Sequence, residues 1–104
     1  MQVQINTDKN ITGDERLTQQ VEEQLRDSLE RFSEKITRIE AHISDENSAK
    51  KGGEDKRCLL EARVAGLQPI SVSAVGEHVT EAVNDAIRKM KRSLESTLGK
   101  LEHR

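Results

Sequence analysis

The densest group of cations in this sequence lies in its last quarter. Within five consecutive positions stand four basic residues, Arg88, Lys89, Lys91 and Arg92. On a helix, Arg88 and Arg92 project away from the apolar stripe. Lys89 lies on one flank together with Lys100, and Lys91 lies on the opposite flank. Cations spaced in this way can follow the phosphates of a nucleic acid backbone, so these residues are candidates for RNA binding.

The same cations also fit a helix that is simply solvated. Asp85 lies three and four positions before Arg88 and Lys89. At this spacing, ion pairs within a helix contribute ~0.2–0.5 kcal/mol each. Residue types and spacing alone therefore leave both phosphate binding and plain solvation open.

A second basic segment falls in and beside an expected exposed loop, residues 45–56, which has no apolar periodicity. Its candidate contact residues are Lys51, Lys56 and Arg57, close to the glycine pair at 52–53. The segment lacks the Gly-x-x-x-x-Gly-Lys-Ser/Thr spacing of a phosphate-binding P-loop, and Glu54 and Asp55 dilute its charge. A solvated hairpin loop and a contact site both remain open.

Two further cations, Arg38 and Arg63, fall on the polar side of expected strands, beside Glu40 and Glu61. They are candidates for RNA contact from a sheet face. Cross-strand Arg–Glu pairs would explain them without any function. His42 shares this side and is interpreted as a passive surface histidine.

Residue types that support catalysis are present but not arranged for it. Cys58 with His42 or His78 would need a third, orienting group, and no recognised spacing supplies one. Cys58 also falls in the inward phase of its strand, which predicts a small buried apolar role. The sequence has no His/Cys cluster spaced for a metal. We expect no catalytic residue, no metal, no cofactor and no enzyme activity.

The elements that must position these residues follow from hydrophobic periodicity. Apolar residues alternate with polar ones over residues 2–6, 38–44, 58–64 and 70–74, which predicts four strands. Apolar residues recur every three or four positions after a capping box at 12–15, up to Phe32, and again over 78–101, which predicts two helices. Gly99 interrupts the second helix at a cost of ~1 kcal/mol relative to Ala.

This order predicts an α+β fold, βαβββα, in one domain spanning residues 1–104. Two amphipathic helices need an apolar surface to pack against. A four-stranded mixed sheet supplies one when both helices pack on the same face. A right-handed crossover through the first helix sets the first two strands parallel. The other face of the sheet is then left in water.

Composition narrows the function further. The chain has 104 residues, 17 Lys plus Arg, 19 Asp plus Glu and a formal net charge of −2, so any nucleic acid binding must come from local segregation of charge. It has no Tyr or Trp, which argues against recognition of single strands by base stacking. No apolar run approaches the ~20 residues of a membrane span, and no signal sequence is present. We therefore expect a cytoplasmic protein without a membrane partner or a small-molecule substrate.

Several local sequences resemble the ribosome hibernation-promoting factor family, the HPF/RaiA proteins, also called ribosomal subunit interface or sigma-factor modulation proteins. The resemblance covers nearly the whole chain. It is carried by residues 45–47, 51–53 and 55–58, by single positions in the later strands, and by the last helix. The single positions are Glu61, Arg63, Gly66, Pro69, Ala82, Val83, Lys89, Arg92, Leu94, Lys100 and Leu101.

The resemblance implies a fold similar to double-stranded-RNA-binding domains. It also implies a translation inhibitor that binds the small ribosomal subunit and its rRNA near the decoding region and excludes mRNA and tRNA during stress. Ending at residue 104, the sequence resembles the short form of the family. Residues 78–84 depart from the family's usual Asp-Met-Tyr-Ala-Ala-Ile-Asp. Two other classes stay open: a diverged protein-interaction module, with self-association through a strand edge, and, more remotely, a small-ligand or metal binder.

Overall fold

The computed structural model describes residues 1–8, 11, 15–45 and 55–102, and the side chains up to residue 100. Four strands form one sheet: β1 (Gln2–Thr7), β2 (Ile36–Asp45), β3 (Lys56–Val64) and β4 (Ile70–Gly76). The helices are α1 (Glu15–Ser28), the short 3-10 helix η1 (Glu30–Phe32) and α2 (Val79–Glu102). The predicted βαβββα order and the α+β class are confirmed.

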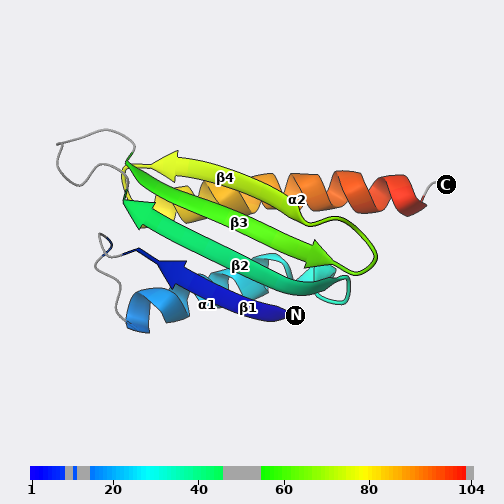
Figure 1. The fold of residues 1–104 in the computed structure, drawn as a ribbon, viewed down its shortest axis with the longest axis horizontal. Helices are drawn as coiled ribbons and strands as arrows, with labels where there is room; N and C mark the ends of the chain where they lie inside the picture. The colour runs from blue at the N-terminus through cyan, green and yellow to red at the C-terminus, as the bar shows by residue number, and fades with distance from the viewer. Residues whose placement is uncertain (9–10, 12–14, 46–54, 103–104) are drawn as a thin grey trace.

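The strands lie in the order β1-β2-β3-β4 (Figure 1). β1 runs parallel to β2, with Val3 opposite Ile39, whereas the later neighbours are antiparallel. This is the predicted mixed sheet, in which the helical crossover makes the first two strands parallel. β1 and β4 are therefore the two edge strands.

Both helices lie on the same side of the sheet (Figure 1). α2 packs against β3 and β4, and α1 packs against β1. The core between the layers is aliphatic: Leu25 and Leu29 meet Ile39, Leu60 and Met90, all fully buried. Among the described residues no polar or charged side chain is buried. The opposite face of the sheet carries the polar half of each strand, as predicted from the period of two.

The first helix is shorter than its apolar stripe predicted. α1 ends at Ser28, and Phe32 lies in η1. Phe32 donates its backbone N–H to the Leu29 carbonyl at 2.9 Å, three residues back, which tightens the chain into a 3-10 turn. This turn keeps Phe32 buried while the chain leaves the helix toward β2. The predicted capping box at 12–15 lies mostly outside the described residues.

All four strands extend beyond the predicted ranges, and the two central ones have consequences for the predicted loop. β2 begins at Ile36, with an irregularity between Ile36 and Arg38, and β3 begins at Lys56. Asp45 and Lys56 are register partners at the sheet end, not loop residues. Within the described part of the chain, no helix is long and apolar enough to cross a membrane.

Candidate nucleic-acid interface

Three of the predicted contact residues gather at the β4 edge of the sheet. Arg88, Lys89 and Arg92 of α2 line a shallow hollow of about 330 Å³ together with Ala74 and Val75 of β4. All three cations are exposed. We call them the β4-edge cluster.

The helix positions this cluster through its apolar stripe. Met90 and Leu94 are fully buried, which turns Arg88 and Arg92 outward and brings Lys89 toward the sheet edge. The Lys89 Nζ donates a hydrogen bond to the Ser73 carbonyl at 2.8 Å. A cation of α2 is thereby tied to the backbone of the edge strand.

One carboxylate lies among these cations. Asp85 lines the same hollow, and its Oδ1 lies 3.2 Å from Arg88 Nη1. The pair is exposed, with 64% and 45% of the two side chains accessible, so water screens it and it stabilises the helix little. Arg92 has no ion-pair partner among the described residues. The cluster therefore keeps a net positive charge.

Lys91 and Lys100 lie apart from the cluster. Lys91 follows Asn84 by two helical turns on the flank that faces α1, where Asn84 accepts a hydrogen bond from Gln24. On the same flank Glu95 pairs with Arg31. Lys100 is exposed, but eight residues after Arg92 it lies ~12 Å farther along the helix axis. α2 extends past the sheet at this end (Figure 1).

Arg38 and Arg63 lie on the open face of the sheet and are directly opposite each other in the register. Their acidic neighbours Glu40 and Glu61 also face each other. The register therefore does not form the cross-strand Arg–Glu pairs that were the alternative to RNA contact. Ion pairs run along each strand instead, Arg38 to Glu40 at 2.7 Å and Arg63 to Glu61 at 3.9 Å. Because like charges directly opposite each other are unfavourable, these pairs along the strands offset the repulsion.

Lys56 and Arg57 point to opposite sides of β3, as neighbouring strand residues must. Lys56 lies on the helix side, where its Nζ is 2.9 Å from Asp55 Oδ1 and 3.3 Å from Asp45 Oδ2. Its hydrogen bond to Asp55 raises the pKa of Lys56 and lowers that of Asp55. Arg57 lies on the open face between Ser44 and Val75. Lys51 lies outside the described residues.

The nine predicted contact residues that the structure describes thus do not form a single surface. Three gather in the β4-edge cluster, while Arg38 and Arg63 are paired with carboxylates on the open face. The sequence had not indicated the neutral part of the hollow, Ala74 and Val75. Val75 is 45% exposed, and its outward phase in β4 is the signal that could have placed it.

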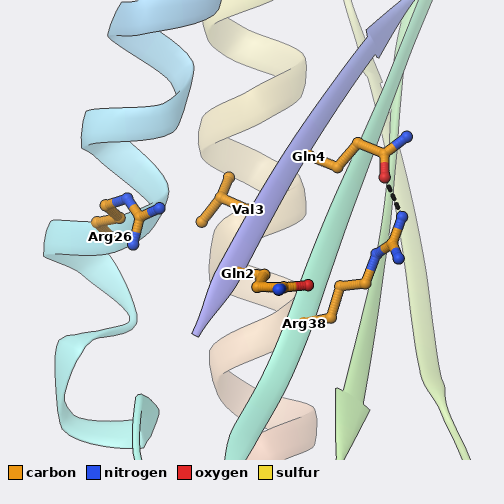
Figure 2. Close-up of a pocket in the computed structure, with 5 residues that line it drawn as sticks. All are labelled: Gln2, Val3, Gln4, Arg26 and Arg38. Carbon is orange, nitrogen blue, oxygen red and sulfur yellow. Dashed lines mark hydrogen bonds between the residues drawn. The ribbon is translucent and has the colours of Figure 1, made fainter.

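A second hollow, of about 380 Å³, lies at the opposite edge of the sheet and is lined by Gln2, Val3, Gln4, Arg26 and Arg38. Figure 2 shows Gln4 and Arg38 on one side of β1, joined by a hydrogen bond, and Val3 directed toward α1 on the other. Arg26 of α1 donates to the Met1 carbonyl at 3.2 Å and pairs with Glu22 at 3.0 Å. Both cations of this second hollow, Arg26 and Arg38, thus already have partners within the protein.

Groups with catalytic or metal-binding chemistry are not organised around either hollow. Cys58 is fully buried, as predicted, and burial raises the pKa of its thiol to about 12. Within the described chain, one group could hold a cation: Glu77, His78 and Glu81, whose ligand atoms lie within 4.8 Å of one another. All three are exposed, so water competes fully for any ion there.

The sequence matches one family model over residues 4–102, described as sigma 54 modulation protein / S30EA ribosomal protein. The chain belongs to this family. The match spans the sheet and both helices, and so includes the β4-edge cluster. A comparison with curated proteins finds no match.

Solved structures share this fold. The N-terminal domain of Protein Y from Thermus thermophilus aligns with a TM-score of 0.71 at 13% identity, covering 93% of this chain and 99% of that one. A ribosomal subunit interface protein from Coxiella burnetii aligns with a TM-score of 0.67 at 17% identity, covering 100% of both chains. At such low identity these likenesses establish the fold alone.

Proposed function

We propose that this protein is a translation inhibitor of the hibernation class that binds the small ribosomal subunit. It would occupy the region near the decoding site and exclude mRNA and tRNA by its volume. Membership of the sigma 54 modulation / S30EA family supports the ribosomal partner. A ribosomal partner would place this activity in the cytoplasm.

The observation that carries the proposal is the β4-edge cluster. Arg88, Lys89 and Arg92 line one hollow between the helix α2 and the edge strand β4. Exposed cations beside a shallow hollow suit the phosphates of a folded RNA, which proteins recognise largely by shape and backbone contact. The sheet face has no aromatic residue for base stacking. Recognition through the RNA backbone is therefore the mode that these residues favour.

The inhibition needs no chemical step. The described structure places no nucleophile beside a base, and Cys58 is kept protonated in the core. A rigid two-layer domain on the small subunit would compete with mRNA and tRNA for space. Its inhibition would be reversed by dissociation alone. Salt would promote release, because each phosphate contact displaces a condensed counterion that the RNA takes up again when the protein leaves.

Sedimentation with purified small ribosomal subunits through sucrose tests this proposal. We expect the protein to co-migrate at low salt and progressively less at moderate salt. The double variant Lys89→Glu, Arg92→Glu should abolish co-migration, because it places two negative charges in the hollow. The variant Lys91→Glu, a charge reversal on the same helix but on the flank facing α1, should retain it. Thermal melting of each variant checks that the fold is intact.

A second candidate is a protein-interaction module that retains the fold without ribosome binding. The open sheet face favours it, because Arg38 and Arg63 are paired with carboxylates there and the whole chain is acidic. Failure of the wild-type protein to co-migrate even at low salt would support this candidate. Equal binding of the double variant and the wild type would remove the β4-edge cluster from the interface.

A further inference from the structure

The two edge strands of the sheet are protected to different degrees. At β4, the Lys89 side chain bonds to the Ser73 carbonyl, and the neighbouring cations of α2 flank the strand. At β1, Arg26 reaches only the Met1 carbonyl, at the very start of the strand. Within the described residues, nothing pairs with the rest of the outer side of β1. Unpaired strand edges are templates for pairing with another strand.

Two hydrogen bonds show which residues of β1 face this outer side. The Asp8 N–H donates to the Ile43 carbonyl of β2 at 3.0 Å, so the residues in phase with Asp8 direct their backbone groups toward β2. The alternate residues direct theirs outward, in agreement with the Met1 carbonyl that Arg26 contacts. Val3 and Ile5 therefore present outward N–H and C=O groups.

The side chains of β1 are compatible with a second copy of the same strand. Residues 2–7 carry no charge, proline or glycine, so the usual devices that discourage edge pairing are missing from the strand itself. The polar residues Gln2, Gln4 and Asn6 lie on the open face, whereas Val3 and Ile5 lie on the helix side. This pattern is symmetric about Gln4.

We propose that the protein self-associates through β1, pairing antiparallel with β1 of a second copy about a two-fold axis at Gln4. In this register Val3 faces Ile5 of the partner subunit, and both residues offer outward backbone groups. The two symmetric pairs exchange two hydrogen bonds each. Gln4 faces Gln4 of the partner subunit in the pair between them, and the two sheets become one.

The hollow at this edge supports the geometry. Figure 2 shows Gln4 and Arg38 on the open face and Val3 on the side of α1. In the paired strands, the polar side chains of one copy therefore lie beside polar side chains of the other, and the apolar side chains lie beside apolar ones. Val3 and Ile5 are only partly buried, and pairing would cover them further. The β4-edge cluster lies at the far edge of the sheet and stays exposed in the dimer. Because one short strand contributes a small interface, the dimer should be weak and concentration-dependent.

Sedimentation velocity on the full chain, from about 1 µM to about 1 mM, tests the proposal. We expect the wild type to shift from monomer to dimer over this range. The variant Gln4→Lys should remain monomeric, because two lysines would face each other on the axis beside two copies of Arg38. Mixing it with Gln4→Glu should restore the dimer. Ser71→Lys, a matched change on the opposite edge strand, should dimerise like the wild type.

A disulfide trap detects even a transient dimer. Residues facing each other in a non-hydrogen-bonded antiparallel pair have Cα atoms ~4.5 Å apart, within the range that a disulfide spans. Under mild oxidation, Gln4→Cys should therefore form a covalent dimer, while Ser71→Cys should form far less. A wild type that stays monomeric throughout and is not trapped through Gln4→Cys would overturn the proposal. A dimer that forms equally well with Gln4→Lys, or that the mixture fails to restore, would also overturn it.

Discussion

Cys58 illustrates how burial sets the chemistry of a single residue. The side chain lies in the inward phase of β3 and is fully buried. Its pKa rises from 9.0 to about 12 because burial penalises the charged thiolate. The thiolate fraction near neutral pH is thus far lower in the folded chain than in the unfolded one.

Reaction with a water-soluble disulfide reagent should reveal this difference. We expect Cys58 of the native protein to react at least about a hundredfold more slowly than in urea, because the folded chain both protonates and covers the sulfur. The absorbance of the released thiol follows the reaction. Cys58 is the sole cysteine of the chain, so no second thiol complicates the measurement. Equal rates in the two states would contradict burial.

Lys56 and Lys89 differ in how strongly their charges are already neutralised. Lys56 lies between Asp45 and Asp55, whereas Lys89 bonds to a neutral carbonyl. Lys56→Gln should therefore leave the salt dependence of subunit binding unchanged. Lys89→Gln, which removes the same charge, should lower the magnitude of the slope of log K against log salt by ~0.7–0.9, the contribution of one phosphate contact. Binding titrations at several salt concentrations measure both slopes, and equal slopes would contradict this assignment.

At the scale of the element, the end of β4 and the start of α2 meet at Gly76. A Cβ placed there would lie 2.8 Å from the Glu81 Cβ and 3.1 Å from the Ala82 backbone nitrogen. A Cβ placed on Gly99, within α2, would have no neighbouring atom within 4 Å. Gly76 therefore has no room for a side chain, whereas Gly99 has space for one.

Alanine substitutions should separate these two positions. We expect Gly76→Ala to lower the free energy of unfolding by ~1–3 kcal/mol, because the backbone of α2 must move away. Gly99→Ala should raise it by up to ~1 kcal/mol, because alanine favours the helix. Urea denaturation measures both. Changes of the same sign at the two positions would contradict the contact at Gly76.

The elements themselves could be predicted because their signal is local. Alternation in the strands and the three- and four-residue spacing in the helices depend only on which face is buried. The turn at Phe32 could not be predicted, because a buried aromatic residue in the right phase looks the same whether the helix continues or tightens. The start of β3 at Lys56 was missed because its pairing with Asp45 depends on how β2 and β3 lie side by side, and the charged residues there show no apolar alternation.

At the scale of the whole molecule, the candidate site was predictable only in part. Arg88, Lys89 and Arg92 come together because they share one helix, so spacing alone places them. Spacing along the chain gives no information on what stands across from a strand. A glutamate opposite Arg38 was therefore one interpretation that the sequence left open, and the residue opposite is Arg63. The hollow likewise depends on β4 lying beside α2, which is a property of the packed molecule.

The bare face of the sheet has a consequence for how such a protein changes over generations. Every second position of each strand contributes nothing to the core, so substitutions there alter what a partner meets while the packed half of the strand stays the same. Substitutions on the open face can thus change the surface charge one residue at a time while the core stays the same. Sequences can drift far apart in this way while their backbones still superimpose.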